Sequence, residues 1–350
     1  MHPVIRPWQE PMATSSPRLG AAQWGPADTA MKILFISHNR LGDAVLSTGL
    51  LQYLALRYPG ARVTIACGPV PAPLLALAPN VEAVMVMEKA PLAGHWRRLW
   101  RQTIGQRWDL VVDLRASLLA WLLRAGQRRV LRSNYNDLHR VRHAGSVLQL
   151  SEPPAPRLWL RPEHIEVAAA HLPPGGAVLA LGPTANWGGK QWPIQRFTEL
   201  AQRLIASDGL FPGAHVAVFG AANERPATQP LLDGLPREQR IDLVGRIDLP
   251  AVLACLRRSD FFIGNDSGLM HMAAAAAIPT LGLFGPSREE LYGPWGPKAA
   301  SVRTDRSFDD IGNDPAYDYR RQDSWMTTLS VAKAEAAARA LHARIAEMAR

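Results

Sequence analysis

The feature that most constrains this chain is a short apolar run followed by a polar loop and a helical stretch, a unit that recurs along both halves. The first run is 33–36, and the spacing of the leucines after it predicts a helix from Asp43 to about Tyr58. Such alternation is typical of parallel strands joined by crossover helices, which predicts an α/β fold. Further strands are predicted at 62–66, 83–87, 110–113, 177–181, 215–219, 241–244, 261–264 and 280–284.

Length and proline content predict two domains. The 350 residues exceed the roughly 250 to 300 at which a single hydrophobic core stops growing. A proline-rich passage from Pro153 to Pro174 discourages long regular elements, so we place the linker there. The predicted division is a loose N-terminal extension (1–30), a Rossmann-like acceptor-binding domain (31–160), a linker (161–176), a Rossmann-like nucleotide-sugar-binding domain (177–330) and a C-terminal amphipathic helix (331–350).

The last of these segments has a clear helical pattern. Leu341, Ile345 and Met348 fall on one face, and Ser330 can cap the helix start. In doubly wound domains ligands bind at the carboxyl ends of the strands. We therefore expect the active site in the cleft between the two halves.

Cysteine usage and charge limit the classes of partner. Cys67 and Cys255 are too far apart for a disulfide framework or a zinc site, which fits a reducing cytoplasm and predicts no metal. Residues 267–287 lack charged side chains, but Gly and Pro divide them, which favours a small helix and a buried strand over a membrane span. The net charge of +9 indicates an anionic partner, such as a nucleotide, a phosphorylated lipid, a membrane or a nucleic acid.

The first loop with chemical potential, His38–Asp43, follows the first apolar run. Gly42 permits a tight turn that would point Asp43 into the cleft at a helix start. A carboxylate there can act as a general base on a hydroxyl, but Asp is also a good helix cap. Position alone leaves both roles open.

A second loop follows the predicted strand 261–264 and begins a helix. Free N–H groups and the positive end of the helix dipole can bind a diphosphate there. Ser267 and Gly268 allow close approach and His271 can add a donor, although a helical His is also commonly structural. Asp266 would repel phosphate, so capping or binding of ribose or sugar hydroxyls suits it better.

A third, Gly-rich loop, Gly182–Pro193, follows the first strand of the second half. Lys190 can neutralise a leaving diphosphate and Thr184 can hydrogen-bond it. The Gly-Lys-Ser/Thr ending of a Walker A motif is absent, so the loop is not a P-loop.

Segments from all three loops carry a family resemblance. They are Leu-Gly-Asp at 41–43, Lys-Gln-Trp-Pro at 190–193, and the block 265–274 followed by 283–287. In this order they resemble glycosyltransferase family nine, the bacterial lipopolysaccharide heptosyltransferases, from about Met31 to Glu347. The resemblance implies a GT-B fold, in which two Rossmann-like domains have parallel sheets that face each other across a cleft.

The resemblance also implies transfer of heptose from ADP-heptose to a lipopolysaccharide core or a related envelope glycan. The implied transfer inverts the anomeric carbon and needs neither a metal nor a cofactor. Asp43 matches the family's proposed base, which would take a proton from the attacking acceptor hydroxyl. Lys190 and the loop 266–271, which includes Leu269, match contacts to the donor. Glu224 falls near a position associated with the nucleotide.

The acceptor is less constrained, because the chain departs from the family pattern at 37–40 and at Arg115. Two basic segments, one interleaved with Trp96, Trp100 and Trp108, suit a phosphorylated glycolipid and peripheral contact with the cytoplasmic face of a membrane. A solvated basic face with its Trp residues packed on the sheet is the alternative. The acceptor-side candidates are Arg40, Gly42, Arg128, Arg129 and Arg132.

Three other functions compete with this interpretation. A nucleotide-sugar epimerase of the same architecture would use similar nucleotide loops without a lipid acceptor. A nucleic-acid-binding protein would explain the positive charge, but no recognised motif supports it, and we expect no nucleic-acid partner. A non-catalytic glycolipid-binding relative is disfavoured because Asp43 and Lys190 are present.

Overall fold

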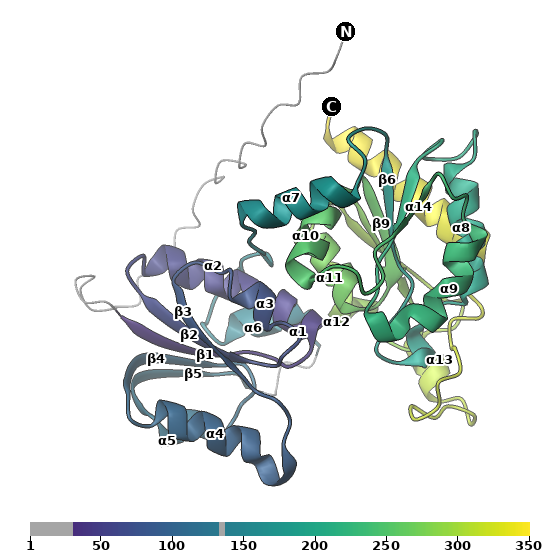
Figure 1. Cartoon of the computed structure of the whole chain (residues 1–350). Helices are drawn as coiled ribbons and strands as arrows, with labels where there is room; N and C mark the ends of the chain where they lie inside the picture. Colours follow the sequence, from purple (N-terminus) through teal and green to yellow (C-terminus); the bar gives the residue numbers. More distant parts are fainter. Residues whose placement is uncertain (1–30, 133–136) are drawn as a thin grey trace.

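In a computed structural model, which describes residues 31–132 and 137–350, the chain forms two halves, each built on a parallel β-sheet (Figure 1). The expected N-terminal extension, 1–30, lies outside the described residues. The first sheet has five strands in the order β3-β2-β1-β4-β5. They are β1 (Lys32–Ile36), β2 (Arg62–Cys67), β3 (Val81–Val86), β4 (Arg107–Asp113) and β5 (Arg124–Val130).

Helices cover both faces of this sheet because successive residues of a strand point to opposite sides. In β1, Ile33 and Phe35 join one apolar cluster, whereas Leu34 and Ile36 join another. The first cluster is covered by α2 (Thr48–Arg57), α3 (Ala72–Leu75) and α6 (Arg140–Ser146). The second is covered by α4 (Gly94–Thr103), which follows the short turn η1 (Pro91–Ala93), and by α5 (Leu119–Leu122).

The second sheet has six strands in the order β11-β10-β9-β6-β7-β8. They are β6 (Val178–Gly182), β7 (His215–Val218), β8 (Arg240–Asp242), β9 (Phe261–Asn265), β10 (Thr280–Phe284) and β11 (Ala299–Arg303). One face is covered by α8 (Ile194–Ile205), α9 (Arg225–Gly234) and α14 (Val331–Met348). The other is covered by α7 (Pro162–His171), α10 (Leu249–Arg257) and α11 (Gly268–Ala275). Short helices η2 (Gly188–Lys190), η3 (Ala222–Glu224), α12 (Glu289–Tyr292) and α13 (Phe308–Gly312) lie in the loops.

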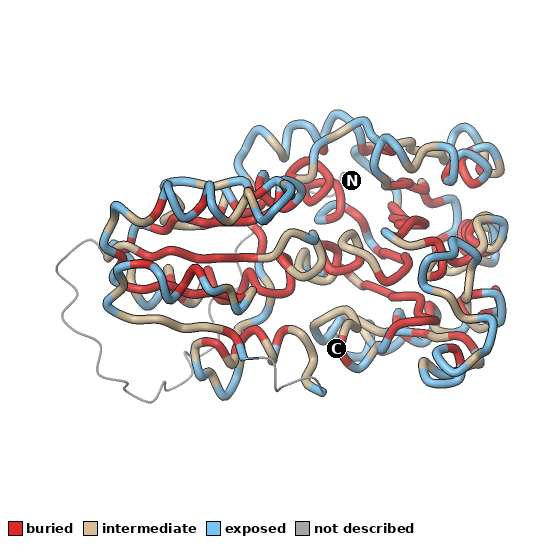
Figure 2. The backbone as a smooth tube through the Cα atoms, turned by 90° about the horizontal axis from the view of Figure 1, so that it is seen from below, coloured by how far each residue is buried: buried red, intermediate tan, exposed pale blue. Residues whose placement is uncertain are grey.

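The two halves share apolar contacts. Val45 of α1 (Leu41–Leu46) and Leu74 of α3 are buried in a cluster otherwise built from the second half and the segment leading into it. Helix α1 packs directly against α11. Buried backbone runs along the strands of both halves, and the exposed residues lie on the outer helices and loops (Figure 2).

Several sequence predictions are corrected. The single helix expected from Asp43 is two helices, α1 and α2, which meet at Ser47, where the Ser47 hydroxyl donates to the Ala44 carbonyl. The expected linker contains α7, because Pro162 occupies a first-turn position that needs no N–H partner, and α7 packs against α10. The C-terminal helix is present and capped by Ser330, but Met348 is 57% exposed rather than packed.

Candidate active site

Helix α1 places Asp43 in its first turn, at the carboxyl edge of the first sheet. Arg40 precedes the helix with an extended backbone, is exposed and makes no side-chain cap. Asp43 is the third helical residue and half-buried, and within the described chain no hydrogen bond holds its carboxylate to the helix end. The capping role that the sequence left open is therefore not observed. The carboxylate is available for chemistry.

Helix α11 brings the second candidate loop opposite Asp43. A methyl group at Gly42 would lie 2.9 Å from Cδ2 of His271, and one at Gly268 would lie 2.7 Å from the side chain of Leu41. Only glycine at both positions allows this approach of the two helix starts. Asp43 is close enough to His271 to oppose the fall in that imidazole's pKa.

The start of α11 offers unpaired donors and acceptors. In the described chain, the Ser267 hydroxyl and Nδ1 of His271 are buried without a hydrogen-bond partner. Burial lowers the pKa of His271 to about 4, with the charges of Asp266 and Asp43 acting in the opposite direction. At neutral pH this side chain is therefore a neutral imidazole that can still donate one N–H to a ligand.

Lys190 and Asp266 form an ion pair at this site, which changes the role expected for Asp266. Lys190 Nζ lies 2.5 Å from Asp266 Oδ2, and the Asp266 side chain is 5% exposed. The carboxylate therefore positions Lys190 instead of capping the helix. Asn265, which the sequence did not single out, fixes this loop because it accepts from the Trp192 N–H and donates to the Pro183 carbonyl.

The remaining donor-side candidates lie on neighbouring loops of the second half. Thr184 follows β6 and is buried, and Leu269 is half-buried in the first turn of α11. Glu224 lies after β7, where its carboxylate accepts from the Ala221 N–H. Part of the Glu224 carboxylate is therefore used to shape its own loop.

A set of side chains on the first half lies beside Asp43; the sequence drew attention to 37–40, Trp96 and Arg115 separately but did not predict that they contact one another. Arg115 donates to Asn39, and its guanidinium lies 4.5 Å from the centre of the Trp96 ring. Asp113 is fully buried and accepts from the Arg115 N–H. Burial lowers the pKa of His38, and the Asp43 carboxylate acts in the opposite direction. We call His38, Asn39, Trp96 and Arg115 the acceptor edge.

The predicted basic acceptor residues do not act as one group. The Arg128 guanidinium donates to the carbonyls of Ala120, Leu123 and Ala125, so it stabilises the turn between α5 and β5. This engagement favours a structural role for Arg128 over the predicted acceptor role. Arg129 is a half-buried residue of β5, and Arg132 is exposed after it.

The second basic segment connects the halves. Nε2 of His139 lies 2.9 Å from the Gly293 carbonyl, to which it donates, and the His139 ring lies 4.7 Å from the Trp295 ring. Arg140 lies over the ring of Tyr292, at 5.0 Å. These contacts fix the first half against the loop around α12, a role that sequence alone did not predict.

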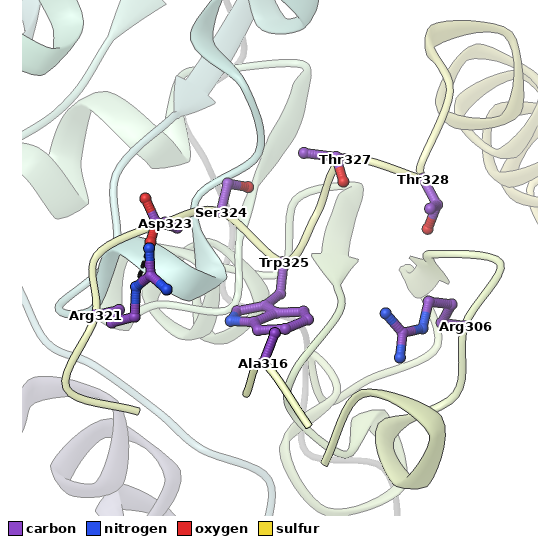
Figure 3. A pocket seen from close by; sticks show the side chains of 8 residues that line it. All are labelled: Arg306, Ala316, Arg321, Asp323, Ser324, Trp325, Thr327 and Thr328. Carbon is purple, nitrogen blue, oxygen red and sulfur yellow. Dashed lines mark ion pairs between the residues drawn. The ribbon is translucent and has the colours of Figure 1, made fainter. Parts of the chain in front are cut away.

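A pocket of about 320 Å³ lies beyond the Lys190 loop and is lined by Trp325, Arg306 and Arg321 among others (Figure 3). Its arginines are paired with carboxylates, Arg306 with Asp314 and Arg321 with Asp323. The segment that lines the pocket is joined to the Lys190 loop by two hydrogen bonds. The Trp325 N–H donates to the Gly189 carbonyl and the Ser324 hydroxyl donates to the Gln191 carbonyl.

In residues 31–132 and 137–350 no three His, Cys, Asp or Glu side chains are grouped so as to hold a metal ion. Among the helices described, none is both long and apolar enough to cross a bilayer.

Solved structures share this architecture. The Escherichia coli ADP-heptose LPS heptosyltransferase II superposes with a TM-score of 0.72 at 22% identity and covers 91% of this chain and 100% of its own. A family 9 glycosyltransferase from Veillonella parvula gives 0.74 at 21% identity, over 89% of this chain and 97% of its own. The fold is therefore that of the GT-B class of glycosyltransferases.

Sequence comparison finds a family match in the second half and relatives along most of the chain. Residues 147–310 match the model of glycosyltransferase family 9 (heptosyltransferase). Lipopolysaccharide heptosyltransferase 2 of Escherichia coli K12 is 28% identical in an alignment 313 residues long, which covers 78% of this chain and 88% of that protein. Lipooligosaccharide heptosyltransferase 2 of Haemophilus influenzae is 25% identical in an alignment 311 residues long, which also covers 78% of this chain and 88% of that protein. Residues 147–310 thus carry a glycosyltransferase family 9 domain, and the chain is a glycosyltransferase.

Proposed function

We propose that this enzyme transfers a heptose from ADP-heptose to the lipopolysaccharide core or a related envelope glycan. The names of its sequence relatives support this substrate class. The observation that carries the proposal is the contact of Gly42 with His271, because it brings the free carboxylate of Asp43 to the start of α11. The start of α11, on one side of this contact, can hold a donor diphosphate. Asp43, on the other side, can activate an acceptor hydroxyl.

The donor diphosphate binds at the start of α11. The backbone N–H groups there, together with the unpaired Ser267 hydroxyl, are suited to phosphate oxygens. Lys190, held by Asp266, supplies an ammonium group that can donate to a phosphate oxygen. Thr184, Glu224 and Leu269 lie on the adjoining loops and complete the nucleotide side.

The reaction is a direct displacement that inverts the anomeric carbon. An acceptor hydroxyl attacks this carbon, the bond to the diphosphate oxygen breaks, and the hydroxyl proton moves to the Asp43 carboxylate. An aspartate is a weak base, so its help comes late, when the hydroxyl has become acidic, and is typically worth about 10² to 10⁴ in rate. Lys190 and the N–H group of neutral His271 stabilise the charge that develops on the leaving ADP.

In this proposal the transfer needs no metal and no cofactor. The cation that would otherwise neutralise the diphosphate is replaced by Lys190 and by the start of α11. We expect ADP release to be unaffected by excess EDTA. A loss of turnover that Mg²⁺ or Mn²⁺ restores would contradict this part of the proposal.

The acceptor is an anionic glycolipid presented on the cytoplasmic side of the membrane, and nucleic acid is not a partner. Its charged headgroup enters beside the acceptor edge, where Arg115 and the exposed Arg40 supply positive charge. Gly42, Arg129 and Arg132 lie in the same half and remain acceptor-side candidates.

Calorimetry followed by turnover tests the proposal. ADP-heptose and ADP should bind more tightly than UDP, and ADP release should require a core glycolipid. Epimerisation or hydrolysis of the donor without an acceptor would favour the epimerase alternative. Binding of glycolipid without any turnover would favour a non-catalytic relative.

A further inference from the structure

The outer surface of the α4 and α5 helices carries exposed apolar side chains. Both helices pack inward on one face of the first sheet, through Leu99 of α4 and through Leu119 and Ala120 of α5. Their outer sides therefore point away from the same face of the sheet, and Figure 1 draws both helices on that side. The exposed apolar residues are Leu92 (88%), Leu118 (73%), Trp121 (63%), Leu122 (55%) and Trp100 (37%).

The same surface is basic and free of carboxylates. Neither 89–108 nor 114–132 contains an Asp or a Glu. The exposed arginines of these segments are Arg97, Arg98, Arg101, Arg107, Arg124 and Arg132. We call the exposed residues 92, 97, 98, 100, 101, 118, 121, 122 and 124 the α4–α5 face.

The structure changes which tryptophans contribute to this surface. Trp108 is fully buried and donates to the Thr103 carbonyl, and Trp96 lies beneath Arg115. Of the three tryptophans that the basic sequence pattern suggested, only Trp100 is exposed. Most of the exposed apolar area instead comes from Leu92, Leu118 and Trp121, which the sequence pattern did not single out.

We infer that the α4–α5 face docks on the anionic surface of a lipid bilayer. Interfacial binding combines apolar side chains that enter the headgroup region with cations that attract anionic lipids, and this face has both. An amphipathic helix on a protein surface normally exposes polar residues, so exposed Leu118, Trp121 and Leu122 need an apolar partner.

The position of the α4–α5 face supports a lipid bilayer as its partner. Leu118 follows Arg115 by three residues and Leu92 precedes Trp96 by four, so the face continues directly into the acceptor edge. If the proposed glycolipid acceptor is correct, docking here would bring the headgroup of a membrane-embedded acceptor to the cleft. The docking itself does not depend on the identity of the sugar.

Vesicle co-sedimentation of the full chain, without any sugar donor, tests the inference. The probes are vesicles of phosphatidylethanolamine with phosphatidylglycerol, and vesicles of phosphatidylcholine alone. We expect binding to the anionic vesicles that weakens as salt is added. L118Q/W121Q and R97Q/R98Q/R101Q should each lower the affinity about tenfold or more.

The control is L56Q, because Leu56 is 72% exposed on α2, which covers the opposite face of the sheet. It should bind vesicles as the wild type does. The changed side chains are exposed, so all variants should keep the wild-type Tm. Thermal melts check that none of them is misfolded. Failure of the wild type to bind anionic vesicles, or equal binding by all variants, would overturn the inference.

Light scattering separates a lipid surface from a second copy of the chain. A wild-type dimer that becomes a monomer only in the α4–α5 variants would assign this face to self-association and contradict membrane docking. Because the assay contains no sugar, loss of vesicle binding leaves the proposed transfer reaction unaffected. Failure of the transfer reaction likewise leaves the vesicle result unaffected.

Discussion

Gly42 of α1 lies so close to His271 of α11 that a methyl group on Gly42 would meet the imidazole Cδ2 at 2.9 Å. His271 is buried, so its ring cannot move into solvent to make room. The two halves of the enzyme thus meet at a position where one added carbon changes the distance between the proposed base and the donor site.

Substitution of Gly42 by Ala should lower kcat/KM by at least about tenfold, because displacement of reacting groups by a fraction of an ångström is costly in rate. Stability should change by no more than about 1 kcal/mol, since Ala favours the helix while the contact opposes it. Steady-state ADP release and thermal melts measure the two effects. G60A is the control, because no atom lies within 4 Å of a Cβ at Gly60. Normal turnover by G42A would show that the contact is not needed.

Lys190 and Asp266 can be separated by a double-mutant cycle. K190A should weaken donor binding at least about tenfold, because a charge-assisted contact to phosphate is lost and Asp266 is left buried without its partner. Calorimetry with ADP measures this loss. In K190A/D266N the unpaired buried charge is gone, but the contact to phosphate is still missing. Recovery of wild-type affinity in the double variant would mean that Lys190 only neutralises Asp266.

His271 should make the folded state sensitive to acid. Burial lowers its pKa from 6.5 to about 4, so above pH 6.5 the imidazole is neutral in both the folded and the unfolded chain. As the pH falls from 6.5 towards 4, the unfolded chain gains a proton that the folded chain does not, and stability is lost. Urea unfolding at pH 7 and pH 5 should show that H271Q loses about 2 kcal/mol less than the wild type. An equal loss would indicate that His271 is protonated in the folded enzyme.

Arg128 should matter for stability and not for the acceptor. Its guanidinium donates to three backbone carbonyls, so R128M should cost about 2 to 3 kcal/mol of unfolding free energy. The KM for the glycolipid should stay within about twofold, because no part of the predicted effect involves substrate. R132M is the comparison, since Arg132 is exposed in the same half. A raised acceptor KM with normal stability in R128M would restore the acceptor role.

The alternation of strands and helices in the sequence predicted most of both sheets, but it missed β5 and β11. Both are edge strands: β5 ends the first sheet order and β11 begins the second. Both are less buried than the inner strands and carry polar residues, as the three arginines of β5 show. A search for apolar runs therefore overlooks them. Confirmed strands such as β1 and β9 lie inside the sheets and are buried throughout or nearly so, and the edge strands β3 and β8 were predicted because they carry apolar residues.

The three candidate loops were visible in the sequence because each joins a strand to small polar residues. Their mutual arrangement was not, since the Gly42–His271 contact joins positions more than 200 residues apart. The residues of the acceptor edge were each named from the sequence, but their grouping was not predicted, for a similar reason. Arg115, Asn39 and Trp96 come from three different loops or helices and have no common sequence spacing.

The proposed role of Asp43 is tested most directly by acceptor-dependent ADP release from D43N, with ADP-heptose binding measured in parallel. Asn keeps the size of the side chain and cannot accept the proton, so turnover should fall by about 10² or more while donor affinity stays unchanged. Turnover of D43N within about threefold of the wild type would contradict the account, because the free carboxylate facing α11 would then not be the base.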